Sequence, residues 1–172
     1  MEAEVLLPTA KTRAWVRDLW LAAGSAAEEA QRVADHLVAA NLAGHDSHGI
    51  GMVGPYVRSL LADELQLNQR IAVITDTDTL VVVDGNRGMG QTIAYQTMEL
   101  AIERARQHGV VIIGLRNSHH LGRVGHWAEQ AIAAGLASIH FTNVVSRPLV
   151  APHGGAQGRF GTNPFTVGLP RR

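Results

Sequence analysis

Cysteine is absent from the 172 residues of the sequence. A disulfide framework, a thiol nucleophile and a zinc site with cysteine ligands are therefore excluded. An excess of either charge is absent as well, because 15 lysine and arginine residues balance 15 aspartate and glutamate residues. Binding to nucleic acid or to an anionic membrane generally requires a basic excess, so we expect neither partner.

Long hydrophobic runs are also missing, and none approaches the ~18 residues that a membrane-spanning helix needs. Residues 1–4 are acidic and lack the basic start and the apolar core of a signal peptide. Apolar residues nevertheless make up 46% of the chain, which is enough for a sizeable core. We therefore expect a soluble, cytoplasmic protein.

Helical periodicity dominates the first third of the chain. Residues 9–23 and 25–43 predict two helices, and Ser25, followed three residues later by a glutamate, matches a capping box at the start of the second. Residues 53–61 repeat apolar side chains at helical spacing and predict a third helix. We expect residues 1–68 to form a helical N-terminal region.

Residues 69–172 are expected to form an α/β sheet region, the start of a cofactor-binding domain that ends early. β-Branched runs predict strands at 71–74 and 80–83. The stretch 110–141 has the order strand, loop, helix and strand, which predicts a βαβ unit with parallel strands, the first buried on both faces. The expected fold class is α/β, with a helical N-terminal third followed by a mixed α/β sheet region.

Proton-binding side chains are concentrated between two predicted helices in the SHG loop (residues 44–49), Gly44-His45-Asp46-Ser47-His48-Gly49. A short joint between rigid elements is a poor place for core packing and a good place for a reactive group. The alternative is a glycine that ends one helix and a serine or aspartate that caps the next, with solvated histidines.

A second cluster, the NSHH loop (residues 117–123), follows an apolar strand and contains Asn117, His119, His120 and Arg123. Ligands bind beside the carboxyl ends of strands in open α/β sheets, so this loop is a candidate site. The alternative is that one histidine caps the following helix while the other is solvated.

Two further motifs lie at strand ends, Thr142-Asn143 and Gly161-Thr162-Asn163-Pro164. Taken singly, each is typical of a turn. Taken together, they supply small side chains and backbone donors where a nucleotide could bind.

Several well-known motifs are missing. The sequence has no G-x-G-x-x-G fingerprint, because residues 85–90 carry their glycines in another order and are more typical of a strand-to-helix turn. A Walker A sequence, a G-x-S-x-G elbow and H-E-x-x-H are absent too. The nine histidines lack recognised metal-ligand spacing, so we expect no bound metal.

Four motifs, in their order and approximate spacing, resemble the malate/L-lactate dehydrogenase family, which also contains ureidoglycolate, diketogulonate, sulfolactate and piperideine-carboxylate enzymes. They are Asp46-Ser47-His48-Gly49, Asn117-Ser118-His119-His120, Thr142-Asn143 and Gly161-Thr162-Asn163-Pro164. The match covers essentially the whole chain, and residues 44–52 are most similar to the hydroxycarboxylate dehydrogenase branch.

The resemblance implies a sulfolactate-dehydrogenase-like fold that is not a Rossmann fold, in agreement with the missing fingerprint. It also implies a homodimer and the interconversion of a 2-hydroxy acid and a 2-keto acid of the malate or lactate type, with NAD or NADP. In the matched motifs, His48 corresponds to the proton donor or acceptor and His120 to a second catalytic histidine. Such roles suit histidine, which titrates near neutral pH.

Substrate and cofactor contacts follow from the same resemblance. Ser47 is expected to contact the substrate. The residues expected to contact the cofactor are Thr142, Asn143, Val144, Gly161, Thr162 and Asn163.

Two departures from the family pattern stand out. Many relatives have an arginine four residues after the SHG histidine, where it can clamp the substrate carboxylate, but here that position is Met52. Methionine cannot form a bidentate pair with a carboxylate, and Arg123 or Arg147 is a candidate replacement. Family chains are also about twice as long, so the chain is expected to be the N-terminal half of such an enzyme.

Two alternatives to a dehydrogenase stay open. One is a non-catalytic binding module that kept the fold, which the missing second half favours. The other is a metal-dependent hydrolase that uses the histidines. The presence of both His48 and His120 favours the oxidoreductase.

Overall fold

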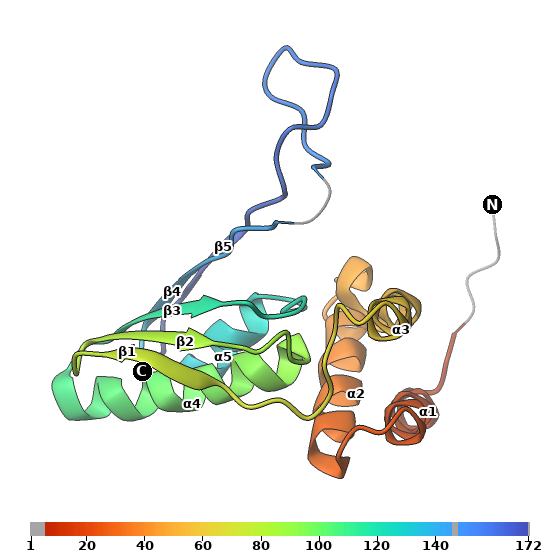
Figure 1. Ribbon diagram of the computed structural model, residues 1–172, viewed down its shortest axis with the longest axis horizontal. Coiled ribbons are helices and arrows are strands. Elements are labelled where there is room, and N and C mark those ends of the chain that lie inside the picture. Colours follow the sequence, from red (N-terminus) through yellow and green to blue (C-terminus); the bar gives the residue numbers. More distant parts are fainter. Residues whose placement is uncertain (1–5, 146–147, 172) are drawn as a thin grey trace. The chain divides into compact units, whose positions relative to one another are not determined.

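The computed structural model describes residues 6–145 and 148–171. They form two compact units, of which the first ends at Arg123 and the second begins at Val124. The first unit holds helices α1–α4 and a three-stranded sheet, and the second holds helix α5 and a two-stranded sheet (Figure 1).

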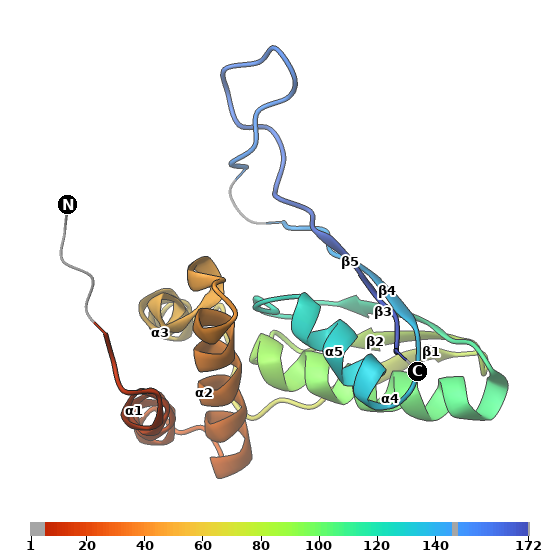
Figure 2. The same ribbon diagram turned by 180° about the vertical axis from the view of Figure 1, so that it is seen from behind.

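Three helices form the start of the first unit: α1 (Thr9–Ala22), α2 (Ala27–Leu42) and α3 (Val53–Leu61). These helices confirm the three that helical periodicity predicts. Figure 2 shows α1 and α3 beside α2. Their apolar faces, together with residues from the following loops, bury one core. Its members are Val16, Trp20, Ala30, Val33, Ala34, Leu37, Val53, Tyr56, Leu65 and Met89.

The start of α2 differs from the predicted capping box. Ala26 is the N-cap residue and makes no side-chain cap, while the Ser25 hydroxyl donates to Oε1 of Glu29 at 3.0 Å. The backbone N–H of Asn68 donates to the same oxygen at 2.9 Å. The Glu29 carboxylate, in the first turn of α2, therefore joins Ser25 to the loop after α3.

The sheet of the first unit consists of β1 (Ala72–Asp76), β2 (Leu80–Asp84) and β3 (Ile112–Arg116). β1 and β2 pair antiparallel, whereas β2 and β3 pair parallel. The connection between β2 and β3 contains α4 (Gly90–His108), so β2–α4–β3 is a βαβ unit. Helix α4 runs along the sheet in both Figures 1 and 2.

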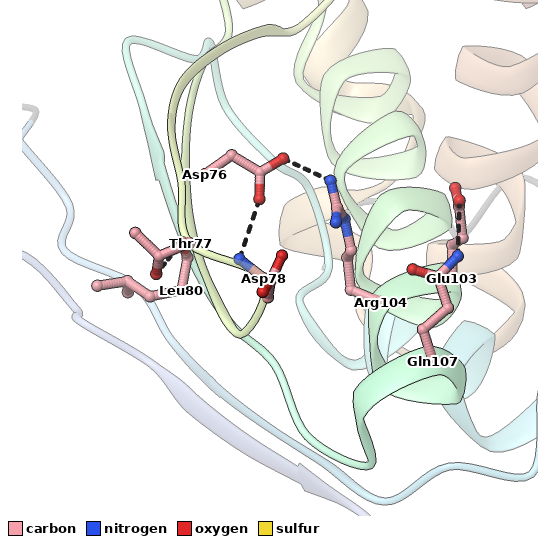
Figure 3. A network of polar contacts seen from close by, with 7 residues as sticks. All are labelled: Asp76, Thr77, Asp78, Leu80, Glu103, Arg104 and Gln107. Carbon is pink, nitrogen blue, oxygen red and sulfur yellow. Dashed lines mark hydrogen bonds and ion pairs between the residues drawn. The ribbon is translucent and has the colours of Figure 1, made fainter.

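Polar contacts fasten the outer end of the β1–β2 hairpin to α4 (Figure 3). Arg104 of α4 forms an ion pair with Asp76 at the end of β1. The Asp76 carboxylate also accepts the backbone N–H of Asp78 at 3.2 Å, and the Thr77 hydroxyl donates to the carbonyl of Leu80 at 3.2 Å. The turn is thus closed locally and held to the helix beside it.

The second unit consists of α5 (Gly125–Ala133), β4 (Ser138–Phe141) and β5 (Phe165–Gly168), and the two strands pair antiparallel. The predicted parallel βαβ unit at 110–141 is therefore wrong: β3 pairs with β2, and β4 pairs with β5. Burial of the first strand on both faces is also wrong, since Ile112 is 66% exposed. An apolar run indicates a strand but does not specify which strand pairs with it.

One face of the β4–β5 pair is apolar and exposed. Phe141 and Phe165 are cross-strand neighbours whose ring centroids lie 6.5 Å apart, and Phe141 is 82% exposed. Ile139 and Val167 form the next pair on this face. On the opposite face, Gly168 lies against Ala128 of α5. Apolar patches of this kind are typical of surfaces that bind further protein.

Within the described ranges, no helix is long and apolar enough to cross a membrane.

The change from helices to strands lies between Leu61 and Ala72. A domain boundary between residues 68 and 69 stays a prediction.

Leu37 and Leu61 provide a matched test of the core, because Leu37 is 0% exposed and Leu61 is 82% exposed. We expect Leu37→Ala to lower the free energy of unfolding by about 2–5 kcal/mol, since it leaves a cavity in the core. Leu61→Ala should change it by less than about 0.5 kcal/mol. Urea denaturation followed by tryptophan fluorescence measures both, and equal effects would contradict the described core.

Candidate active site

The SHG loop is held in shape by Asn41, a residue that sequence reasoning did not single out. Its Oδ1 accepts the backbone N–H of Ile50 at 2.8 Å, and its Nδ2 donates to the Asp46 carboxylate. A Cβ atom on Gly49 would lie 2.2 Å from Asn41 Oδ1, so a larger residue there would displace the Asn41 side chain. The loop contains one short 3₁₀ turn, Asp46–His48, and a second, Ile50–Met52, follows it and leads into α3.

The two histidine-bearing loops meet within the first unit. The ring centroids of His48 and His120 lie 5.1 Å apart, and the rings are stacked at an angle of 29°. The ring of His45 meets His48 edge-on at 4.6 Å. The SHG loop and the NSHH loop, 72 positions apart at these two histidines, therefore share one site.

The glycine-rich turn before α4 supports the NSHH loop. A Cβ atom on Gly90 would lie 2.0 Å from the carbonyl oxygen of His120, so the first turn of α4 can approach this backbone only as glycine. The N–H of His119 donates to the carbonyl of Gly88 at 3.2 Å, and the N–H of Arg87 donates to the carbonyl of Asn117 at 2.8 Å. Residues 85–90 are thus the strand-to-helix turn predicted, with a supporting role.

Tyr56 and Gln91 lie behind His120. The hydroxyl of Tyr56 is 2.7 Å from His120 Nδ1, and Gln91 Nε2 donates to the same hydroxyl at 3.0 Å. Tyr56 is 1% exposed and Gln91 is 0% exposed. Sequence reasoning placed Tyr56 on the apolar face of its helix and missed its polar end, because helical periodicity treats tyrosine as a hydrophobic residue.

Burial lowers the pKa values of the histidines in the site. It lowers the pKa of His120 to about 4, and the neighbouring His48 and His119 add to this effect. The pKa of His48 is also below its ordinary value, first through burial and then through the charge of His45. Burial raises the pKa of Tyr56. At neutral pH both stacked imidazoles are therefore uncharged.

Ser47 lies directly against the first histidine. Its hydroxyl oxygen is 2.9 Å from His48 Nδ1, and the direction of this hydrogen bond depends on the tautomer of the ring. The structure therefore shows Ser47 as a neighbour that orients His48, and its contact with a substrate stays a prediction.

The structure describes Arg123 and Met52, but it does not describe Arg147. The backbone N–H of Arg123 donates to Nε2 of the buried His36 at 3.0 Å, which fixes the end of the NSHH loop. Arg147 lies outside the described residues. Met52 packs against the hydrophobic core. A carboxylate contact by either arginine stays a prediction.

The proposed cofactor-contacting residues lie in the second unit. Antiparallel pairing of β4 and β5 places the end of one strand beside the start of the other, so residues 142–144 and 161–163 are adjacent. The Val144 N–H donates to Asn163 Oδ1 at 2.8 Å, and a Cβ atom on Gly161 would lie 2.6 Å from the Val144 carbonyl oxygen. The close backbones leave Asn143 and Thr162 exposed.

This donor set fits the polar groups of a nicotinamide nucleotide. An exposed amide and an exposed hydroxyl can hydrogen-bond a carboxamide, a ribose or a phosphate.

In the part of the chain that the structure describes, no group of three or more His, Cys, Asp or Glu side chains is placed to hold a metal ion.

The sequence matches the family model described as malate/L-lactate dehydrogenase over residues 7–172. It is 54% identical over 149 residues to hydroxycarboxylate dehydrogenase B of Escherichia coli strain K12, an alignment that covers 87% of this chain and 41% of that protein. The chain thus spans less than half of that relative's length.

Solved structures confirm the predicted fold. Malate dehydrogenase from Pyrococcus horikoshii OT3 superimposes with a TM-score of 0.91 at 36% identity, covering 99% of this chain and 48% of that one. Sulfolactate dehydrogenase from Methanocaldococcus jannaschii gives a TM-score of 0.88 at 32% identity, covering 95% and 47%. The α/β fold is therefore sulfolactate-dehydrogenase-like.

The partly buried His120 gives a direct test of the site. We expect its ring to titrate with a pKa of about 4, because burial and the two adjacent imidazoles disfavour the charged form. Following the ring carbon-bound protons by NMR across the acid range measures this value. Titration near the ordinary value of about 6.5 would contradict the described burial.

The same shift predicts how stability depends on pH. In the unfolded chain His120 binds a proton near pH 6.5, whereas in the folded chain it does so only near pH 4. Between these values the unfolded chain holds more protons, so this contribution to stability is lost as the pH falls from about 6.5 to about 4. In His120→Asn the loss should be smaller, which urea denaturation at several pH values measures.

Proposed function

Because the chain belongs to the malate/L-lactate dehydrogenase family, we propose that it is part of an NAD- or NADP-dependent oxidoreductase that interconverts a 2-hydroxy acid and a 2-keto acid. The observation that carries this proposal is the stacking of His48 on His120 within one site. Two neutral imidazoles beside each other can hold the oxygen of an alcohol or a ketone and move its proton.

His48 is the proposed acid and base. In the oxidation direction its neutral imidazole takes the hydroxyl proton of the substrate, while the carbon–hydrogen bond breaks and its electron pair leaves as hydride, so that the carbonyl forms. A bound nicotinamide cofactor would supply the hydride acceptor in this direction and the hydride donor in reverse. His48 is half-buried and carries the Ser47 hydroxyl on Nδ1, so Nε2 is the nitrogen left for the substrate.

Binding of the substrate carboxylate is assigned to cationic side chains of this chain. Arg123 and Arg147 are the proposed partners, and Ser47 is a proposed contact of the hydroxy or keto group. Met52 takes no part, because a thioether cannot pair with a carboxylate and the side chain packs on the core.

The cofactor is assigned to the joined loops of the second unit. Asn143 and Thr162 are exposed donors there, and Thr142, Val144, Gly161 and Asn163 shape the backbone around them. A homodimer and a cytoplasmic location, both expected from the sequence, stay predictions. The exposed apolar face of β4–β5 is consistent with further protein contacts.

A non-catalytic binding module of the same fold is the second candidate. The observation that favours it is Met52, which stands where many relatives carry the arginine that can clamp a substrate carboxylate. The two candidates differ in one result, namely whether His48 is needed for turnover once a complete active site is present.

A chimera provides that active site. Residues 1–172 replace the matching segment of the E. coli relative, and steady-state reduction of a panel of 2-keto acids is measured with NADH and NADPH. We expect His48→Ala to lower kcat by roughly 10²–10⁴-fold with little change in cofactor affinity, because a positioned acid–base group acts on the chemical step.

His108→Ala is the matched control, since His108 lies exposed in the last turn of α4. It should leave kcat unchanged, and thermal unfolding of each variant shows whether the fold is kept. A near-normal kcat for His48→Ala would remove this residue from the acid–base role and favour the binding module.

The lowered pKa of His48 predicts opposite pH profiles for the two directions. Oxidation needs the neutral ring. Its kcat/KM should therefore increase with pH only in the range below about 6.5, the ordinary pKa of histidine, and stay constant at higher pH. Reduction needs the protonated ring, so its kcat/KM should fall as the pH rises through the same pKa. Initial rates of the chimera from about pH 5 to about pH 9 measure both profiles. A rise in oxidation above about pH 8 would indicate a different base.

A further inference from the structure

We propose that Tyr56 and Gln91 are positioning residues that hold His120 in one tautomer, with its proton on Nε2. His120 then acts as a permanently neutral hydrogen-bond donor to the substrate oxygen, and His48 alone exchanges the proton. This division of roles rests on the proposed function, whereas the tautomer itself rests on the geometry.

The direction of the hydrogen bonds begins at Gln91. Its Nε2 is a donor only, and it lies 3.0 Å from the Tyr56 hydroxyl, so the tyrosine oxygen accepts. The pKa of Tyr56 is raised by burial, so the phenol keeps its own proton. That proton must be donated to another acceptor, because the side chain is 1% exposed and water does not reach it.

The acceptor for the tyrosine proton is His120. Nδ1 of this ring lies 2.7 Å from the Tyr56 oxygen. A nitrogen that accepts a hydrogen bond carries no proton, so the neutral ring carries its proton on Nε2. The chain of three residues therefore selects one of the two neutral tautomers.

The same chain opposes a charged His120. A protonated ring would donate from both nitrogens, and the Tyr56 oxygen would then face two donors, Gln91 Nε2 and His120 Nδ1. The tyrosine proton would lose its acceptor, which leaves a buried donor unsatisfied. His120 is thus suited to donate a hydrogen bond and unsuited to carry a proton.

His48 has the opposite surroundings. Its Nδ1 meets the hydroxyl of Ser47 at 2.9 Å, and this hydroxyl belongs to an exposed residue that can rotate. A serine hydroxyl accepts from a protonated nitrogen as readily as it donates to a bare one. His48 can therefore be neutral or charged without leaving its partner unsatisfied, as an acid–base group requires.

The primary experiment measures the tautomer of His120 in the 172-residue chain, without substrate or cofactor. Long-range ¹H–¹⁵N NMR at neutral pH distinguishes a ring protonated on Nε2 from one protonated on Nδ1, and His120→Asn identifies the signals by their loss. We expect a single Nε2–H tautomer. An Nδ1–H tautomer or an even mixture would overturn the proposal.

A variant pair tests the role of Tyr56. Tyr56→Phe removes the hydroxyl and keeps the ring, so we expect His120 to become a mixture of tautomers. Tyr95→Phe is the matched control, because Tyr95 contacts Arg32 through its ring and is the other tyrosine of the chain. An unchanged single tautomer in Tyr56→Phe would overturn the positioning role.

Gln91→Leu extends the test to the first residue of the chain of hydrogen bonds. With no donor from residue 91, the Tyr56 oxygen can accept from His120 Nδ1, so a fraction of the Nδ1–H tautomer should appear.

In the chimera, Tyr56→Phe should lower kcat by up to ~10²-fold, because a misplaced donor weakens the interaction with the reacting oxygen. Full kcat together with a mixed tautomer would overturn the assigned role of His120.

The outcomes separate this inference from the proposed function. The tautomer is measured on the chain alone, so its failure leaves the dehydrogenase proposal standing. An active His48→Ala chimera would contradict the proposed function, yet it would leave the tautomer of His120 unchanged.

Discussion

The hydrogen bond between the Tyr56 hydroxyl and His120 Nδ1 is the interaction on which the site depends. Tyr56 belongs to α3 and to the hydrophobic core of the helical segment, whereas His120 belongs to the loop that follows β3. A buried tyrosine must place its hydroxyl proton somewhere, and this requirement draws the NSHH loop against the helices. The stacking of His120 on His48 follows from the same placement, because the SHG loop runs directly into α3.

Close contacts at two glycines support the two histidine loops. Gly90 lies against the carbonyl of His120 at a distance that a Cβ atom would not permit, and Gly49 lies against the side chain of Asn41. Gly90 therefore allows the first turn of α4 to approach the NSHH loop, and Gly49 leaves room for the Asn41 side chain that holds the SHG loop. The site is therefore built from a close backbone approach at Gly90, the Asn41 side chain at the SHG loop and the hydrogen-bonded chain from Gln91 through Tyr56 to His120.

The sequence predicted the helices and the two histidine loops, but it did not predict which strands pair or which side chains support the loops. Periodicity is a local signal, so the three N-terminal helices were predicted well. Strand partners are set by long-range contacts, and the run at 110–115 therefore gave a strand but the wrong neighbour. Ser25 matched a capping box, but its hydroxyl donates to Glu29. The same Glu29 oxygen also accepts the N–H of Asn68, which comes from a distant loop. Tyr56, Gln91 and Asn41 were missed because their roles depend on partners that no local pattern shows.

Two imidazoles in contact raise the question of which one carries the proton. With ring centroids 5.1 Å apart, a charge on one His ring disfavours a charge on the other, so the pair holds at most one proton near neutral pH. Burial alone would not assign that proton, because it lowers the pKa of both rings. The partners of Nδ1 decide between them: a rotatable serine hydroxyl beside His48 accepts either state, whereas the Gln91–Tyr56 chain beside His120 accepts only one. The asymmetry of the two histidines thus arises from the residues behind them.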